Sequence, residues 1–494
     1  MKYVSTRDTS ATPFAVSAAE AIKMGLAPDG GLFIPTEVPQ LTHGDMEALL
    51  PMTYAQRAAY ILSLFLPDYD KDALTADCHT AYGEDRFPGG AAPLHDIDGG
   101  DYSLELWHGP TCAFKDMALQ IMPRLLSRAL TMTGEEKTAY ILVATSGDTG
   151  KAALEGYRDV PGVKMAVFYP DDGVSPMQKR QMATQEGNNV YVTAVEGNFD
   201  DAQSGVKAIF GDKALAQKAS DAGFFFSSAN SINWGRLVPQ IVYYVSAYCD
   251  LVKAGKIAEG DEIVVCVPTG NFGNIFAAYT AREMGLPIGK FVCASNSNNV
   301  LTDFIRTGVY DKTREFHKTM SPSMDILISS NLERLLYRLC GPQVTAELMR
   351  ELNTTGKYTL PAEALERLQA LFAGYWLDEA HTAATIRDTY QNDHYLIDTH
   401  TAVGLGSLRQ YRAETGDTRK AVLASTASPY KFAADVCASL GLRADESDIA
   451  GLLSTLSDAT NTQIPAPLAA VLTRPVRFTD VVKPCDMASV PFAH

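Results

Sequence analysis

The chain has 494 residues, of which 46% are hydrophobic and 20% charged, and this composition is that of a folded globular protein rather than a disordered or fibrous one. Its formal net charge of −16 disfavours nucleic acid and anionic membranes as partners, because both would repel it at long range. A single core does not extend over so long a chain, so we expect two or three subdomains.

The start of the chain and its cysteines indicate a reducing compartment. MKYVSTRDTS lacks the apolar stretch of a secretory signal, and no apolar run reaches the length of a membrane span. The eight cysteines show no CxxC pair, zinc-ligand spacing or disulfide framework. We therefore expect a cytoplasmic protein with reduced thiols, no membrane partner and no metal site.

Residues 1–95 have the pattern of a small helical N-terminal domain. SAAEAIKMGLA has helical periodicity, and APDGGLFIP interrupts it with glycine and proline. Helical runs resume at MEALL and at YAQRAAYILSLFL. This domain is expected to carry only a short extended entry segment.

From about residue 100, short apolar runs alternate with amphipathic helical stretches. AYILVAT precedes GKAALEGY, KMAVFYP precedes PMQKRQMATQEG, and EIVVCVP precedes IFAAYTAREMG. Such alternation predicts an α/β fold of mainly parallel sheets with helices on both faces. Residues 310–400 are patterned mostly as helix, and KAVLAST is expected to form one late strand.

Lys115 follows the strand-like run YSLELW and the loop HGPTCAF, and it opens a helix. The helix dipole and desolvation both lower the pKa of an amine in such a place. A partly neutral amine is what imine formation requires. For a lone lysine, an exposed residue at a helix start is the simpler interpretation.

Two glycine-containing turns are candidate anion sites, because each lies between a strand and the start of a helix. TSGDTGK begins at Thr145, and GNFGN begins at Gly270. TSGDTGK is not a nucleotide P-loop, since Thr145 and Ala152 stand where glycine and Ser/Thr are required. GNFGN lacks the GxGxxG spacing of a nicotinamide site. A capped tight turn remains an alternative for TSGDTGK.

The fourth candidate segment is ASTA, in which Thr426 follows the strand KAVL. A hydroxyl in that position faces the region where open α/β sheets bind ligands, although Ser and Thr are also routine helix caps. Taken singly, each of the four segments has a plain structural explanation. Together they all follow strands, and the fold is expected to bring them to one sheet edge.

In this order the motifs HGPTCAFKD, TSGDTG, SINWGR, GNFGN and LASTASPYKF resemble those of the threonine synthases. These enzymes belong to the tryptophan-synthase-β-like group of pyridoxal-phosphate enzymes, and the resemblance covers nearly the whole chain. It implies two open, twisted, mainly parallel sheets flanked by helices. The implied division after the N-terminal domain is a small α/β subdomain at roughly 116–235 and a large one from 96–115 plus 236–494, with a helical insertion at about 310–400.

The resemblance implies roles for the residues that match the motifs. Lys115 would hold pyridoxal 5′-phosphate as a Schiff base and then move protons at Cα and Cβ, and Thr426 would meet the pyridine nitrogen. Backbone amides of one loop would hold the cofactor phosphate: Gly270, Asn271, Phe272, Gly273 and Asn274.

Substrate contacts are implied for two further groups of residues. Those expected to receive the amino-acid end are Ser146, Asp148 and Thr149, and those expected at the substrate phosphate are Asn233, Arg236 and Lys431. The commoner family pattern near the ring nitrogen reads STAHPAKF, so no substrate contact is implied for Ser428 and Tyr430. Two roles stay open for His400: it lines the site, or it caps a helix.

The implied reaction converts O-phospho-L-homoserine and water to L-threonine and phosphate by γ-elimination and β-addition of water, the last step of threonine biosynthesis. A lyase releasing 2-oxobutyrate from the same substrate would carry the same cofactor motifs and stays open. A serine or threonine dehydratase is disfavoured by the N-terminal domain, and a cofactor-dead scaffold by the intact lysine and glycine loop. The short N-terminal start predicts an unregulated monomer or weak homodimer.

Overall fold

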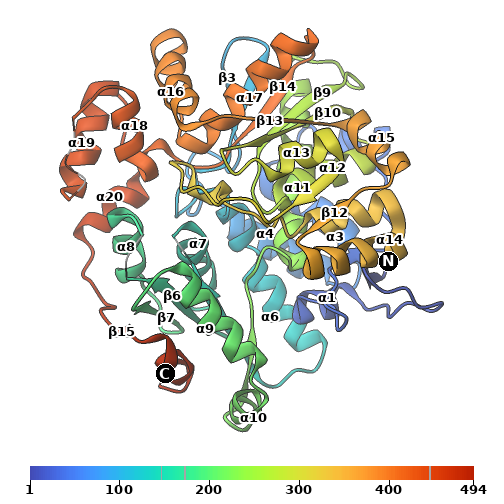
Figure 1. Ribbon diagram of the computed structural model, residues 1–494, viewed down its shortest axis with the longest axis vertical. Coiled ribbons are helices and arrows are strands. Elements are labelled where there is room, and N and C mark those ends of the chain that lie inside the picture. The colour runs from blue at the N-terminus through green and yellow to red at the C-terminus, as the bar shows by residue number, and fades with distance from the viewer. Residues whose placement is uncertain (146, 172–173, 444, 446, 494) are drawn as a thin grey trace.

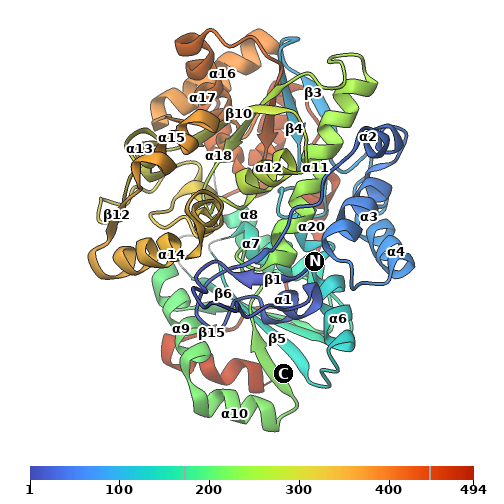
Figure 2. The same cartoon turned by 90° about the vertical axis from the view of Figure 1, so that its right-hand side faces the viewer.

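Two sheets organise the computed structural model, which describes residues 1–145, 147–171, 174–443, 445 and 447–493 (Figures 1 and 2). The larger sheet has the strand order β13-β10-β9-β14-β4-β3 and the smaller one β15-β7-β6-β5-β8. Apart from the β3–β4 pair, every pairing in them is parallel. The predicted α/β class with two mainly parallel sheets is confirmed.

The strands of the larger sheet are β3 (Leu94–Asp96), β4 (Asp101–Glu105), β9 (Ile263–Pro268), β10 (Ile288–Ser295), β13 (Phe372–Trp376) and β14 (Ala421–Ser425). Those of the smaller sheet are β5 (Thr138–Ala144), β6 (Val163–Pro170), β7 (Val190–Val195), β8 (Phe224–Ser227) and β15 (Val481–Val482).

The helices that flank the sheets are α5 (Asp116–Leu119), α6 (Met122–Met132), α7 (Asp148–Tyr157), α8 (Pro176–Ala183), α9 (Phe199–Gly211), α10 (Lys213–Asp221), α11 (Trp234–Lys253), α12 (Gly273–Glu283), α13 (Val300–Thr307), α14 (Leu332–Thr355), α15 (Ala362–Leu371), α16 (Glu379–Asp393), α17 (Thr399–Thr415), α18 (Ala433–Ser439), α19 (Ile449–Thr460) and α20 (Ala466–Thr473). Short connecting elements are β11 (Val309–Asp311), β12 (Lys357–Thr359) and the 3₁₀ turns η1 (Pro322–Met324), η2 (Pro429–Phe432) and η3 (Pro484–Phe492).

Both faces of the larger sheet are buried, which explains its unbroken apolar runs. Along β9, Val264 and Cys266 pack in the same core cluster as α17, whereas Val265 and Val267 belong to the cluster that includes α11 and α12. The 20-residue α11 is buried along almost its whole length and is in contact with α3, α5 and α12. Burial on nearly all sides means that α11 lies inside the protein, and it runs through the middle of the molecule (Figure 2).

The N-terminal segment forms four helices and a two-stranded antiparallel pair. These elements are β1 (Tyr3–Ser5), β2 (Phe33–Pro35), α1 (Ala18–Met24), α2 (His43–Leu49), α3 (Tyr54–Phe65) and α4 (Lys71–Tyr82). Helices α1 to α3 each begin with a capping box, in which the cap side chain and the residue three positions later satisfy each other's backbone N–H group. Arg7 and Glu333 join this segment to α14 through two hydrogen bonds of 2.8 and 2.7 Å.

Two strands lie where sequence patterning did not place them. β13, with the sequence FAGYW, pairs with β10 at the edge of the larger sheet, inside the stretch expected to be mostly helical. Its Gly374 permits close packing, since a Cβ there would lie 2.9 Å from the Cα of Thr302. β15 returns residues from the end of the chain to the smaller sheet, whereas the sequence grouped them with the larger one.

Among the described residues, none of the helices combines the length and the hydropathy needed to cross a bilayer. No group of histidine, cysteine, aspartate and glutamate side chains in the same part of the chain is arranged to hold a metal ion.

Candidate active site

The four candidate segments lie together around Lys115. Its Nζ is 3.9 Å from Asp148 Oδ2, at the start of α7 beyond β5. The N–H of its neighbour Phe114 donates to the carbonyl of Thr426, beyond β14, at 2.8 Å. The same Nζ donates to Ser323 Oγ at 3.3 Å, and Ser323 in turn borders Gly270 beyond β9. Loops that follow β5, β9 and β14 therefore lie close to Lys115, directly or through Phe114 and Ser323.

Burial controls the acidity of Lys115. Desolvation lowers its pKa from 10.5 to about 8, and the nearby positive charges of Lys431 and Arg236 act in the same direction against the opposing Asp148 carboxylate. With that pKa, about a tenth of the amine is neutral at pH 7, against less than about a thousandth for an ordinary lysine. The sequence-based expectation of a partly neutral amine is thereby given a physical cause.

The loop before Lys115 is fixed by pairing with the segment after β14. Ala113 and Ala427 form an antiparallel bridge, and the N–H of Ser428 donates to the carbonyl of Cys112 at 3.0 Å. On the other side, the Asp116 carboxylate accepts from the N–H and the Oγ1 of Thr111, both at 2.8 Å. These bonds set the direction from which the Lys115 side chain leaves the backbone.

Asp148 is held by two cations and an amide. Lys431 Nζ lies 2.8 Å from Asp148 Oδ1, and Gln178 Nε2 donates to the same oxygen at 3.0 Å. Burial alone would raise the pKa of Asp148, but Lys431 and Lys115 together with these hydrogen bonds bring it well below its ordinary value. Asp148 is thus a carboxylate at every working pH.

Lys431 is committed to the protein. Besides Asp148, its Nζ donates to the carbonyl of Thr111 at 2.9 Å, and its side chain is fully buried. The structure therefore places Lys431 in an internal ion pair, which differs from the free ammonium that a direct contact with the substrate phosphate would need.

The TSGDTG turn uses two of its own backbone donors. The N–H groups of Gly147 and Gly150 both donate to Thr145 Oγ1 at 3.0 Å. Gly147 has a φ of 151°, and a Cβ there would lie 2.3 Å from the Gln178 side chain. Thr149 is half-buried in the first turn of α7, and Ser146 lies outside the described residues.

The loop of Gly270 to Asn274 is held rigidly between β9 and α12. Ser329 Oγ donates to the carbonyl of Gly270 at 2.6 Å, and both the N–H and Nδ2 of Asn331 donate to that of Asn271 at 3.0 Å. Phe272 adopts a left-handed φ of 63°. Gly270 has no room for a side chain, since a Cβ would lie 2.7 Å from the carbonyl oxygen of Ser323.

The fit of this loop to a phosphate follows from three of its features. It enters an 11-residue helix, whose N-terminal N–H groups and dipole attract anions. Its glycines permit close approach to the backbone. The Oδ1 of Asn274 accepts from the hydroxyls of Tyr243 and Tyr244, while its buried Nδ2 has no partner among the described residues and is available to a ligand.

A second cationic position lies at the start of α11. Arg236 is 4% exposed, its Nη1 donates to the carbonyl of Ala229 at 2.5 Å, and its buried Nε has no partner in the part of the chain that the structure describes. Burial lowers its pKa to about 10, which still leaves it charged at neutral pH. A buried charged donor without a partner is suited to a buried anion.

Asn233 was expected beside Arg236 as a phosphate contact, but both polar atoms of its side chain bond to backbone groups of the protein. Its Oδ1 accepts from the N–H of Gly235 at 2.9 Å as the N-cap of α11, and its Nδ2 donates to the carbonyl of Ile22 at 2.9 Å. The structure thus assigns its amide to capping α11 and to contact with α1.

Sequence reasoning did not single out Ser323, Asn331 or Gln178. Ser323 and Asn331 lie in a segment without helical or strand periodicity, and Gln178 lies in α8, which carries no motif. Tertiary contacts bring all three to the site. The serine and asparagine residues of SPSMDILISSN, clustered between two helical patterns, were the one available signal of a functional loop.

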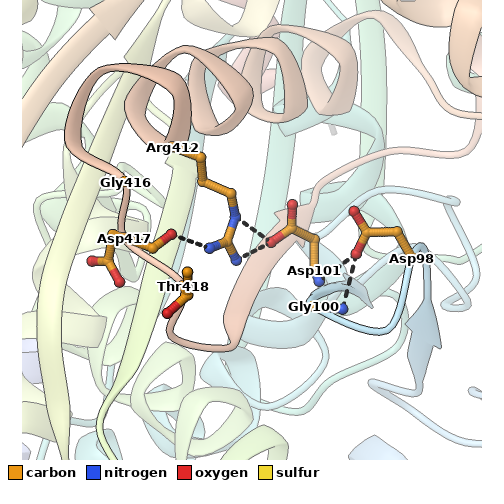
Figure 3. A pocket seen from close by; sticks show the side chains of 7 residues that line it. All are labelled: Asp98, Gly100, Asp101, Arg412, Gly416, Asp417 and Thr418. Atoms are coloured by element: carbon orange, nitrogen blue, oxygen red, sulfur yellow. Dashed lines mark hydrogen bonds and ion pairs between the residues drawn. The ribbon is translucent and has the colours of Figure 1, made fainter.

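A cavity of about 430 Å³ lies at the opposite end of the larger sheet, near the first residues of β4 and β14 (Figure 3). Arg412 in its wall donates to the carboxylate of Asp101 and to the carbonyl of Asp417. Arg412 and Asp101 are thus paired with each other, and the lining of the cavity includes none of the residues described around Lys115.

Comparison with known proteins identifies relatives of the chain. Three family models match the chain: threonine synthase N terminus over residues 2–82, pyridoxal-phosphate dependent enzyme over 102–426, and threonine synthase, C-terminal, over 401–490. The threonine synthase of Pseudomonas aeruginosa is 37% identical over 87% of this chain and 89% of its own length.

Two further proteins extend the comparison. The human protein named threonine synthase-like 1 is 41% identical over 86% of this chain, which spans only 58% of that longer protein. The crystal structure of pyridoxal-phosphate-bound threonine synthase from Brucella melitensis superposes with a TM-score of 0.87 at 36% identity, covering 98% of this chain and 97% of the other. The chain belongs to the threonine synthase family of pyridoxal-phosphate-dependent enzymes.

Proposed function

We propose that the chain is a threonine synthase, which converts O-phospho-L-homoserine and water to L-threonine and phosphate. The observation that carries this proposal is a second anion position close to Lys115. Arg236, buried and with an unpartnered Nε, is near enough to Lys115 to lower its pKa, and it comes from the start of α11 rather than from the loop of Gly270 to Asn274. A substrate with its own phosphate needs such a second position, whereas serine or threonine as the substrate of a dehydratase does not.

The residues present fit pyridoxal phosphate. The loop of Gly270 to Asn274 would hold its phosphate, Lys115 would join its aldehyde carbon, and the hydroxyl of Thr426 would meet its ring nitrogen. When bound, the cofactor supplies an electron-withdrawing ring that stabilises negative charge on the substrate carbon next to the amino group. The hydroxyl of Thr426, unlike a carboxylate in that place, would leave the ring nitrogen mostly unprotonated and would moderate the withdrawal.

The protein side chains then have distinct tasks. Lys115, with a pKa near neutrality, can accept a proton from the substrate Cα or Cβ and later return one. Arg236 would bind the substrate phosphate and stabilise the charge on it as it leaves Cγ. Asp148, ionised and fixed by Lys431, would attract the substrate ammonium, with Thr149 beside it in the first turn of α7.

The test of this proposal is the identity of the product. Incubation of the purified protein with O-phospho-L-homoserine is expected to yield threonine and phosphate. Release of 2-oxobutyrate and ammonia with phosphate would instead make the protein a phospho-lyase. Phosphate that accumulates with neither organic product would contradict both reactions.

A further inference from the structure

Ser323 connects three parts of the site. It lies in the 3₁₀ turn η1, its Oγ accepts from Lys115 Nζ at 3.3 Å, and its N–H donates to His400 Nε2 at 3.1 Å. Its carbonyl oxygen borders Gly270, where an added Cβ would lie 2.7 Å away. The amine of Lys115, the phosphate-binding loop and the start of α17 are thus joined through one serine.

The tautomer of His400 follows from this contact. A backbone N–H can only donate, so His400 Nε2 is the acceptor and its proton resides on Nδ1. Nδ1 then donates to Asp398 Oδ2 at 2.7 Å. Asp398 is fully buried, accepts from the N–H of Thr401 at 3.0 Å as the N-cap of α17, and so holds the imidazole in one orientation.

The turn that carries Ser323 is fixed on its other side as well. Asn296, at the end of β10, is 1% exposed and its Nδ2 donates to Ser321 Oγ at 3.0 Å and to Asp325 Oδ1 at 2.8 Å. The turn is therefore held by the larger sheet and by α17 together. Its position relative to Lys115 is set by buried and partly buried hydrogen bonds to these two elements.

We propose that Ser323, held by the Asp398–His400 pair, is a positioning residue that aims the Lys115 amine at the aldehyde carbon of the cofactor. This rests on the proposed role of Lys115. A lysine side chain has four rotatable bonds, and donation to Ser323 Oγ on one side with the Asp148 carboxylate on the other restricts the direction of the nitrogen lone pair. In the condensation, the neutral amine gives up two protons, a C–N double bond forms, and the aldehyde oxygen leaves as water.

The experiment measures two quantities: the rate at which Lys115 captures the cofactor, which depends on the direction of the amine, and the affinity of the pocket itself. Apoprotein is mixed with pyridoxal phosphate. Covalent capture is followed by growth of the yellow absorption band of the lysine-bound cofactor, and borohydride reduction makes the bond to Lys115 permanent so that its position can be checked. Affinity for pyridoxamine phosphate, which has no aldehyde, is measured in parallel and reports the pocket alone. Ser323→Ala and His400→Ala are expected to capture the cofactor about tenfold more slowly while their affinity for pyridoxamine phosphate stays within about twofold.

Conservative variants and distant controls complete the design. Ser323→Thr keeps the hydroxyl and His400→Gln keeps an acceptor for the Ser323 N–H, so both are expected to capture the cofactor within about threefold of the parent rate. His381→Ala removes a similar aspartate–histidine contact at the exposed start of α16, and Ser489→Ala removes an exposed serine of η3. Both controls are expected to behave as the parent.

Two results would overturn the inference. One is capture by both alanine variants within about twofold of the parent rate. The other is a loss of pyridoxamine phosphate affinity as large as the loss of capture rate, which would make these residues merely structural. A parent chain that forms no yellow band would instead overturn the proposed function itself, so the two failures are distinguishable.

Discussion

Lys431 Nζ lies 2.8 Å from Asp148 Oδ1 in an ion pair sealed from solvent, and this pair joins the segment after β14 to the start of α7. Because Asp148 also faces Lys115, the pair fixes the electrostatic environment of the reactive amine. Removing either partner leaves an uncompensated charge in the interior, which is costly.

Lys431→Met is therefore expected to lower the free energy of unfolding by about 3 kcal/mol, measured by urea denaturation. The double variant Lys431→Met/Asp148→Asn should recover part of this loss, because neither member of this pair is left charged without the other. Lys357→Met is the matched control, since Lys357 and Asp311 form an ion pair of equal length, 2.8 Å, with the lysine half exposed to solvent. It should cost less than about 1 kcal/mol, and an equal loss in the two lysine variants would refute the interpretation.

The pKa of Lys115 predicts the pH dependence of cofactor capture. The neutral amine reacts, and its fraction rises as pH passes through the pKa, so the capture rate should rise with pH to a midpoint near 8. Asp148→Asn removes a negative charge that favours the ammonium form, and it should move this midpoint to lower pH. Asp378→Asn at the surface is the control. A midpoint near that of an ordinary lysine would contradict the buried amine.

Gly270→Ala is expected to weaken cofactor binding at least about tenfold, because the new methyl group would have to displace the turn that carries Ser323. Gly211→Ala is the control, since a Cβ there meets nothing within 4 Å. Equilibrium titration with pyridoxamine phosphate measures both. Unchanged affinity in Gly270→Ala would show that the loop can move away from Ser323 without cost.

Arg236 and Asn233 give opposite predictions although they lie in one motif. Arg236→Gln should raise KM for O-phospho-L-homoserine at least about tenfold and leave the yellow band intact, because it removes the charged donor to the substrate phosphate. Asn233→Ser keeps an acceptor for the N-cap of α11 without placing a charge against the carbonyl of Ile22, and it should change KM much less. Steady-state kinetics decide between them, and a larger KM change in Asn233→Ser would reverse the two assignments.

The sequence predicted most of the framework because its signals are local. The apolar runs of β5, β9 and β14 and the helices that follow them are visible without tertiary information. β13 was not predicted, since FAGYW contains a glycine whose purpose is to let α13 approach, and β15 has only two residues. Both strands join a sheet by pairing with a strand that is distant in the sequence, and local sequence patterns do not indicate such pairing.

The site was predictable in part for the same reason. Lys115 and the glycine loop stand in motifs, but Ser323 is 208 residues away from the lysine that it contacts. The capping role of Asn233 and the ion pair of Lys431 also depend on distant partners, Ile22 and Asp148. Motif order identifies which side chains gather at a site, whereas their individual contacts follow from tertiary packing.

In the proposed reaction Lys115 moves the protons while phosphate leaves and water adds to give threonine. Its most direct test follows phosphate and threonine together, with O-phospho-L-homoserine as substrate, in the parent and in Lys115→Ala. We expect equal amounts of the two products from the parent, and neither product nor a yellow band from the variant. Undiminished turnover in Lys115→Ala, or phosphate from the parent without an equal amount of threonine, would contradict it.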